Sequence, residues 1–169
     1  MATCATHGLG HRSLRDIAAA AGTSHRMLLH HFGSREGLMV AVVQEVEARQ
    51  ARLAASLDGS AAPLLATMWA HLSDAALRPF ERLFFESYAR GANGEAPFDR
   101  LLPDAVDAWL RPVGEATTDP DPAFTRLALA VVRGLLLDLV ATGATAETTA
   151  ALHRFVGLVE AAPAPRPGQ

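Results

Sequence analysis

The segment DIAAAAGTSHRMLLHHF, residues 16–32, decides how the N-terminal part of this chain folds. It begins as an alanine-rich helix, but Gly22 and Thr23 interrupt that helix after only two turns. Glycine can supply the positive φ angle that a tight turn requires. The small side chains of Ala18 and Ala21 allow two helices to cross closely. The segment therefore predicts a helix-turn-helix, with one short helix before Gly22 and a second short helix after it.

Serine residues mark the expected helix starts. Ser13 and Asp16 fit a capping box, in which the Ser13 hydroxyl accepts the Asp16 amide and the carboxylate reaches back. Ser24 is the expected start of the second helix, which ends near Phe32. Ser34 is expected to begin a third helix of roughly 24 residues, which spans about 36 Å at 1.5 Å per residue. This long helix is the continuous element that joins the N-terminal unit to the rest of the chain.

Helical periodicity continues through the rest of the sequence. Apolar residues recur three and four positions apart, and no alternating strand pattern is found, so we expect an all-α fold. The further helices are expected at residues 63–77, 79–90, 98–113, 122–142 and 146–161. The buried face of the helix after Ser34 is expected to carry Leu38, Val42, Val46, Leu53 and Leu57. The proline-rich residues 162–169 are expected to form a disordered tail.

Charge is distributed unevenly along the chain. All 15 basic residues are arginine, and the net charge of the whole chain is −3. Residues 1–35 carry a net charge of +3, whereas the remaining residues carry −6. Five of the seven histidines also fall within the first 31 residues. This asymmetry indicates a basic, anion-binding N-terminal unit on an acidic body.

Several classes of protein are disfavoured by the sequence. Cys4 is the single cysteine, so no intramolecular disulfide forms, and no apolar stretch typical of a signal peptide stands at the N-terminus. The most apolar run begins at Leu127, but Arg133 and Asp138 interrupt it, and both charges would be costly in lipid. We therefore expect a cytoplasmic protein in which this run is a buried helix and no part binds a membrane.

No constellation of residues typical of an enzyme is found. The absence of lysine excludes Schiff-base chemistry and the phosphate-loop lysine, and no H-E-x-x-H or G-x-S-x-G motif is present. His30 and His31 are adjacent, so on a helix their side chains point about 100° apart and are not expected to share a metal ion. We expect no catalytic residues, no metal site and no cofactor.

The N-terminal motif resembles a known family. The residues SLRDIAAAAGTSHRMLLHHFGSREGLMVAV, 13–42, resemble the DNA-binding segment of the TetR family of bacterial repressors. The matching positions are Ile17, Ala18, Ala21, Gly22, Ser24, Leu28, His31, Phe32 and Leu38. Leu29 stands where the family has a tyrosine whose hydroxyl contacts phosphate, and Arg35 replaces the family's lysine with a planar fork. The family has a full helix before this motif, whereas MATCATHG leaves about two turns, so we expect a shortened first helix.

The resemblance implies which residues contact DNA. The second helix of the motif enters the major groove, with its first turns at the base edges and its flanks on phosphates. We therefore expect His25, Arg26 and Met27 at base edges and Arg12 and Arg35 at phosphates. The DNA-binding candidates are Arg12, Ser13, Thr23, Ser24, His25, Arg26, Met27, Leu29, His30 and Arg35. The expected partner is a palindromic operator in double-stranded DNA, bound by a homodimer.

The C-terminal part resembles the same family more weakly. RGLLLDLVATG from Arg133, with the helix after it, resembles the last two helices of the family, which form its dimer interface. The interface candidates are Leu127, Val131, Leu135, Leu139, Leu152, Phe155, Val156 and Val159. Arg133 and Asp138 are expected either to pair across the dimer or to touch a ligand. The resemblance implies two domains, a helix-turn-helix DNA-binding domain at residues 1–47 and a ligand-binding and dimerisation domain at residues 48–169.

A small-molecule effector is expected in the C-terminal domain. The candidate ligand-binding residues are Met68, Trp69, Phe84, Tyr88 and Trp109. Aromatic residues at helical spacing fit an ordinary core equally well, so that alternative stays open. The sequence thus predicts a DNA-binding transcriptional regulator, a repressor that a small molecule releases from its operator. The alternative is a dimeric small-molecule-binding protein whose DNA-binding unit has degenerated.

Overall fold

The computed structural model describes residues 13–57, 61–101, 106–107, 109–110 and 121–161 of the 169-residue chain. Arg12, the tail predicted at residues 162–169 and the end of the helix predicted at residues 98–113 lie outside the described residues. The elements are α1 (Leu14–Ala20), α2 (His25–Phe32), α3 (Arg35–Ala55), α4 (Ala61–Leu72), α5 (Arg78–Ala92), η3 (Phe98–Arg100), α7 (Pro122–Thr142) and α8 (Thr145–Ala161). Every one of these described elements is helical, which confirms the all-α prediction.

The N-terminal helices begin at the predicted caps. The Ser13 hydroxyl accepts the Asp16 amide at 3.3 Å, and the Asp16 carboxylate accepts the Ser13 amide at 3.2 Å, which completes the capping box. Ser24 caps α2 in the same way, since its hydroxyl accepts the Met27 amide at 3.1 Å. Gly22 lies in the turn between α1 and α2 with φ of 66°, a conformation that disfavours any side chain. The predicted helix-turn-helix is therefore confirmed.

Helix boundaries agree with the predictions at some points and differ at others. α3 has 21 residues, so it is about 31 Å long and shorter than predicted. α4 ends at Leu72, because the Asp74 carboxylate accepts the Ala76 amide and forms a turn. The helix predicted from residue 98 begins as the single 3-10 turn η3, followed by a turn residue at Leu101. α7 matches its predicted range, and α8 begins one residue earlier than predicted.

The buried face of α3 differs from the predicted one. Of the predicted residues, Leu38 is buried, whereas Val42, Val46, Leu53 and Leu57 are half-buried. The observed buried residues are Leu38, Met39, Val43, Glu47, Gln50, Ala51 and Ala54. Apolar periodicity alone misplaced this face, because two of its residues carry polar groups that bond to other elements.

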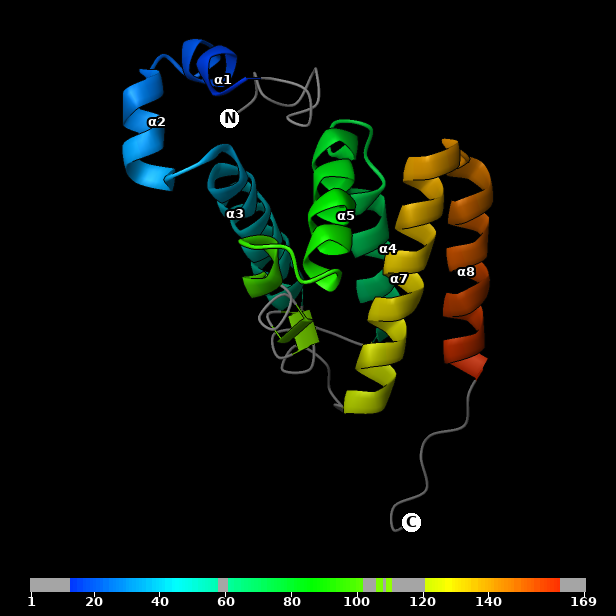
Figure 1. The fold of residues 1–169 in the computed structure, drawn as a ribbon. Helices are drawn as coiled ribbons and strands as arrows, with labels where there is room; N and C mark the ends of the chain where they lie inside the picture. The colour runs from blue at the N-terminus through cyan, green and yellow to red at the C-terminus, as the bar shows by residue number, and fades with distance from the viewer. Residues whose placement is uncertain (1–12, 58–60, 102–105, 108, 111–120, 162–169) are drawn as a thin grey trace.

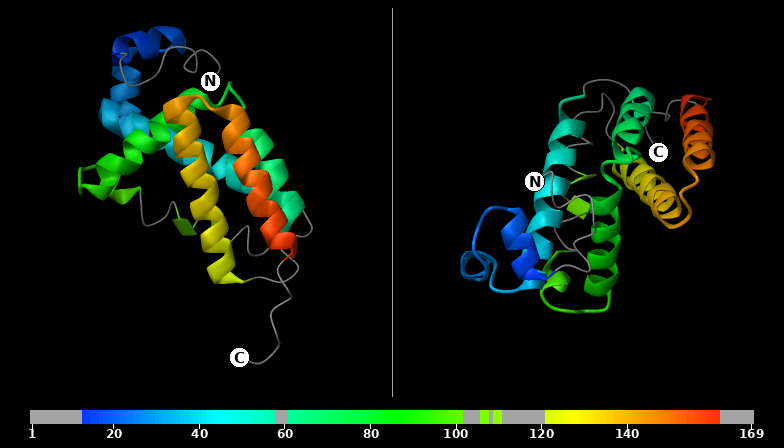
Figure 2. Two further views of the ribbon diagram at one scale, coloured as in Figure 1. Left: turned by 90° about the vertical axis from the view of Figure 1, so that its right-hand side faces the viewer. Right: turned by 90° about the horizontal axis from the view of Figure 1, so that it is seen from above.

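The helices are arranged around two hydrophobic cores. Figure 1 shows α1 and α2 at one end of the molecule, with α3 leading away from them toward the remaining helices. The head core is the apolar cluster of Ile17, Ala18, Leu28, Leu38, Met39, Val43, Leu83, Phe84, Phe98 and Leu101. The body core is formed chiefly by residues of α4, α7 and α8, and α7 and α8 run side by side in both views of Figure 2. α3 contributes buried residues to both cores.

None of the described helices has the length and the apolar content that crossing a membrane would require.

Candidate nucleic-acid interface and ligand cleft

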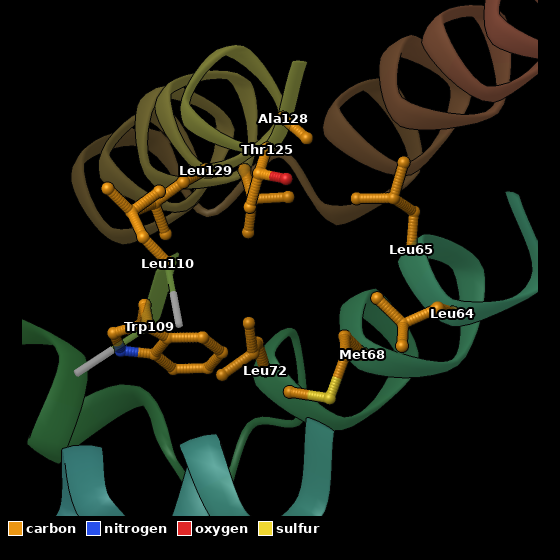
Figure 3. A pocket seen from close by; sticks show the side chains of 10 residues that line it. Leu64, Leu65, Met68, Leu72, Trp109, Leu110, Thr125, Ala128 and Leu129 are labelled. Carbon is orange, nitrogen blue, oxygen red and sulfur yellow. The ribbon is translucent and has the colours of Figure 1, made fainter. Parts of the chain in front are cut away.

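An apolar cleft lies between α4 and α7. Its lining residues are Leu64, Leu65, Met68, Leu72, Trp109, Leu110, Thr125, Ala128, Leu129 and Val132. Figure 3 shows side chains of α4 facing those of α7 across the cleft, with the Trp109 indole along one side. The space between these side chains is about 420 Å³ when its opening toward solvent is included. All lining side chains except Thr125 are apolar, so the cleft suits an apolar molecule.

A second compartment with polar walls borders the cleft. Leu72, Trp109, Leu129 and Val132 line both compartments, so the two are neighbours. The residues that line the second compartment alone are Glu47, Gln50, Glu81, Phe84, Phe85, Arg133 and Leu136. We call Glu47, Gln50, Glu81 and Arg133 the polar end of the cleft. They come from α3, α5 and α7, so three helices must keep their positions for this end to form.

Glu47 is at the centre of one half of the polar end. Its Oε2 atom accepts a hydrogen bond from Trp109 Nε1 at 2.6 Å and lies 3.5 Å from an Arg133 guanidinium nitrogen. Arg133 also lies over two aromatic rings, 5.1 Å from the Phe84 centroid and 5.7 Å from the Tyr88 centroid. Burial raises the pKa of Glu47, while the bond from Trp109 and the charge of Arg133 oppose that increase.

Glu81 occupies the other half of the polar end. It is 4% exposed, and its Oε1 atom accepts a hydrogen bond from Gln50 Nε2 at 3.0 Å. Burial raises the pKa of Glu81 to about 7. The hydrogen bond from Gln50 and the charge of Arg133 act against this increase, whereas the charge of Glu47 adds to it. Glu81 is therefore poised to exchange a proton near neutral pH.

The predicted ligand residues divide between the cleft and the core. Met68 and Trp109 line the apolar compartment, Phe84 lines the polar one, and Tyr88 lies under Arg133. Trp69 is outside this lining. It is 2% exposed, and its indole nitrogen donates to the Thr149 hydroxyl of α8 at 2.9 Å. Trp69 therefore fits the alternative in which such an aromatic residue belongs to the core, and its hydrogen bond joins α4 to α8.

The helix-turn-helix presents one open face. Ile17, Ala18 and Leu28 are buried in the head core, which fixes α2 against α1 and α3. The side chains that remain on the outer side of α2 are exposed. They are Arg26, Met27, Leu29, His30 and His31, while His25 is half-buried. Met27 and Leu29 are 49% and 38% exposed, so this side of α2 carries apolar as well as basic side chains.

The remaining DNA-binding candidates lie around this face. Thr23 is exposed in the turn, and Ser13 and Ser24 are the cap residues of α1 and α2. Arg35 begins α3, where its guanidinium lies 3.8 Å from the Glu36 carboxylate. Arg12 lies outside the described residues. The described candidates therefore share one end of the molecule with the exposed side of α2 (Figure 1).

Comparison with known proteins relates the N-terminal segment to a family. Residues 1–42 match the family model described as bacterial regulatory proteins, tetR family. Over these residues, which include the helix-turn-helix, the chain is similar to the TetR family. This match supports a transcriptional regulator with a DNA-binding segment at its N-terminus. Salmonella enterica GusR is similar in structure, with a TM-score of 0.63 and 23% identity over 93% of this chain and 89% of that chain. At this identity the likeness shows a shared fold. No curated protein matches the chain by sequence.

The last two helices of the chain expose apolar side chains. Leu127 and Leu137 on α7 are 53% and 50% exposed, and Leu158 on α8 is 57% exposed. Ala130 and Gly134 are exposed on the same face of α7 as the two leucines, since these positions recur every three or four residues. The other candidates are half-buried, namely Val131, Leu135, Phe155, Val156 and Val159.

Two interface candidates are buried inside the single chain. Leu139 and Leu152 are 1% and 0% exposed, and both belong to the body core of a single chain. They therefore have no surface left for a second subunit. The stripe at Leu127, Val131, Leu135 and Leu139 drifts around the helix, because steps of four residues exceed the 3.6 residues of a turn. Leu137 lies on the same face as Leu127, because residues 127, 130, 134 and 137 are separated by three or four positions. Steps of four alone do not reach Leu137, so it was not among the candidates.

Sequence patterns did not reveal the polar end of the cleft. Glu47, Gln50 and Glu81 were not among the candidates, and Arg133 was weighed only between a dimer contact and a ligand contact. Arg133 faces Glu47 and the cleft, whereas Asp138 is exposed. The available signal was the position of Glu47 and Gln50, which follow Leu38, Met39 and Val43 along one side of α3 at helical spacing.

Proposed function

We propose that this chain is a homodimeric repressor that binds a palindromic operator and is released by a small molecule in the cleft between α4 and α7. The main support for the proposal is that α3 contributes residues both to the head core and to the polar end of the cleft. Its first half packs Leu38, Met39 and Val43 into the head core. Its second half supplies Glu47 and Gln50 to the polar end of the cleft. One rigid helix therefore touches both the DNA-binding unit and the ligand cleft.

A second connection supports coupling between the two sites. Phe84 of α5 belongs to the head core and also lines the polar compartment. Its ring lies beneath the Arg133 guanidinium of α7. A molecule that enters the polar end therefore meets side chains of α3, α5 and α7 together. Movement of α3 or Phe84 would change the packing beneath α1 and α2, which sets the position of α2 in the DNA groove.

For DNA binding, we assign the exposed side of α2 to the major groove. Arg26 and Met27 then read base edges, and Arg35 at the start of α3 meets a phosphate. The cap at Ser24 orders the first turn of α2, which carries Arg26 and Met27. Two copies of α2, related by the two-fold axis of a dimer, would match two half-sites about 34–36 Å apart.

For dimerisation, we assign the exposed face of α7 and α8. Leu127, Leu137 and Leu158 provide apolar contact area, and the small residues Ala130 and Gly134 allow close approach of a second copy of α7. Val131, Leu135, Phe155, Val156 and Val159 would border this contact. A two-fold interface of this kind uses the same face of each subunit, so one face accounts for both partners.

The proposal is tested by a gel shift with the DNA upstream of the protein's own gene and a scrambled duplex of equal length and composition. The wild-type chain is expected to shift the upstream DNA in preference to the scrambled DNA. Arg26→Ala should remove the preference, whereas Arg49→Ala should retain it, because Arg49 pairs with Glu45 on α3 away from α2. A wild-type chain that shifts neither duplex would favour the ligand-binding protein with a degenerate DNA-binding unit.

A further inference from the structure

We propose that the ligand of this cleft joins an apolar body to one positively charged nitrogen, with the apolar body between α4 and α7 and the charge beside Glu47 and Glu81. The inference deepens the proposed function, on which it rests for its regulatory consequence. It follows from the charges at the polar end, from the apolar lining next to it and from the lining residues that the two compartments share.

Among the described residues that line the polar end, carboxyl groups outnumber cationic groups. There Glu47 and Glu81 face one guanidinium, that of Arg133. Arg133 lies 3.5 Å from Glu47 and over the Phe84 ring, so its positive charge already interacts with these two side chains. Among the residues that the structure describes, Glu81 has the neutral Gln50 amide as its hydrogen-bond donor and no ion-pair partner. A cation near Glu81 would therefore meet a carboxyl group whose counter-charge, Arg133, is shared with Glu47.

Burial strengthens the effect of the two carboxyl groups on a bound charge. Glu81 and Glu47 are 4% and 8% exposed, so water screens their charges poorly. Burial also raises the pKa values of both carboxyl groups, as expected where the ionised form lacks full compensation. A ligand cation would replace the proton as the compensating charge. An anionic ligand would instead add a third negative group beside two carboxyls, with Arg133 already engaged.

Aromatic faces around the polar end also favour a cation. Phe84 and Trp109 line the polar compartment, and Phe84 already holds the Arg133 guanidinium at cation–π distance. Trp109 donates its indole hydrogen to Glu47, so its ring forms a wall shared by both compartments. Trp109 would thus contact both the charged nitrogen and the apolar body of the ligand.

Shared lining residues place the apolar region next to the carboxyl groups. Leu72, Leu129 and Val132 line both compartments, so the apolar region and the carboxyl groups lie on two sides of the same side chains. On the α4 side the apolar compartment offers only Leu64, Leu65, Met68 and Leu72. A strongly polar molecule would leave its hydrogen-bonding groups unpaired there. The apolar body and the single charge are therefore parts of one ligand.

The test uses three probes of nearly equal shape, 4-phenylbutylamine, 4-phenylbutanol and 4-phenylbutanoate. Their affinities for the full chain are measured by isothermal titration calorimetry at one pH and salt concentration, without DNA. We expect the amine to bind at least about tenfold more tightly than the alcohol and the carboxylate. Glu81→Gln should reduce the affinity for the amine by about tenfold or more and leave that for the alcohol within about twofold. Glu86→Gln, on the exposed side of α5, should change neither affinity.

The outcomes separate this inference from the proposed function. Equal affinities for amine and alcohol, tightest binding of the carboxylate, or no binding of any probe would overturn the inference. An amine affinity unaffected by Glu81→Gln would also overturn it, provided that circular dichroism shows the variant to be folded. An amine that binds as expected and leaves DNA affinity unchanged would count against the proposed function alone.

Discussion

Glu81→Gln should make the protein more stable above neutral pH. The Glu81 carboxyl is buried in the polar end, and its pKa of about 7 lies above its ordinary value of 4.5. A group whose pKa is raised by folding stabilises the folded state while it is protonated. That contribution is complete below pH 4.5 and is lost as the pH rises through 7. The difference of about 2.5 pKa units corresponds to roughly 3 kcal/mol of unfolding free energy.

Glutamine removes the titration and keeps the hydrogen bond. The amide oxygen that Glu81→Gln introduces can still accept the bond that Gln50 donates to Glu81. The other charged groups facing this site, Glu47 and Arg133, stay in both proteins, so the variant removes one titrating carboxyl and leaves its charged neighbours in place. Relative to wild type, the variant should therefore gain about 2–3 kcal/mol between pH 5 and pH 8, with most of the gain between pH 5 and pH 7.

The assay is urea unfolding at pH 5, 6, 7 and 8, followed by circular dichroism at constant ionic strength and protein concentration. Constant concentration is needed because dimer formation contributes to the measured stability. Glu86→Gln is the control, since Glu86 is an exposed carboxyl on the same helix. An unfolding free energy difference between Glu81→Gln and wild type that stays constant from pH 5 to pH 8 would refute the reasoning.

Three further outcomes are expected. Arg35→Ala should weaken binding to all DNA sequences alike and reduce the salt slope by about 0.9 per lost contact in each subunit, whereas Met27→Ala should change operator preference; an unchanged preference in a panel of operator variants would remove Met27 as a base-reading residue. Leu137→Glu should give monomers in analytical ultracentrifugation, because a charge would enter the proposed apolar interface, and a dimer of unchanged affinity would place the interface elsewhere. Gly22→Ala should cost about 1 kcal/mol of stability in urea unfolding, since its φ of 66° is unfavourable for alanine although no atom lies within 4 Å of the added Cβ; a neutral effect would argue against that turn.

Local signals in the sequence predicted the N-terminal unit well. Ser13 with Asp16, Ser24 and Gly22 each act through neighbours within four residues, so the sequence contains all the information that their geometry requires. Pro122 and Gly143 bound α7 in the same local way. The end of α4 was less predictable, since apolar periodicity continued past the turn at Asp74.

The ligand cleft depends on contacts between distant segments, which periodicity does not encode. Glu47 bonds to Trp109, 62 residues away, and Gln50 bonds to Glu81, 31 residues away. From the sequence alone, Glu47 resembles Glu45, which forms an exposed ion pair with Arg49. The orientation of α3 against α5 distinguishes the two glutamates, and that orientation is set by packing. Met68 and Trp109 could be proposed as ligand residues because large apolar side chains suit either a core or a cleft.

The central claim is that occupancy of the cleft opposes DNA binding. Its most direct test is the affinity of the wild-type chain for the DNA upstream of its own gene, measured by fluorescence anisotropy without and with a saturating concentration of the tightest cleft probe. Coupling through α3 and Phe84 predicts that the probe weakens DNA binding by about 5- to 150-fold, equivalent to about 1–3 kcal/mol. Linkage requires the DNA to weaken probe binding by the same factor. DNA affinity that is unchanged or increased by the probe would contradict the account.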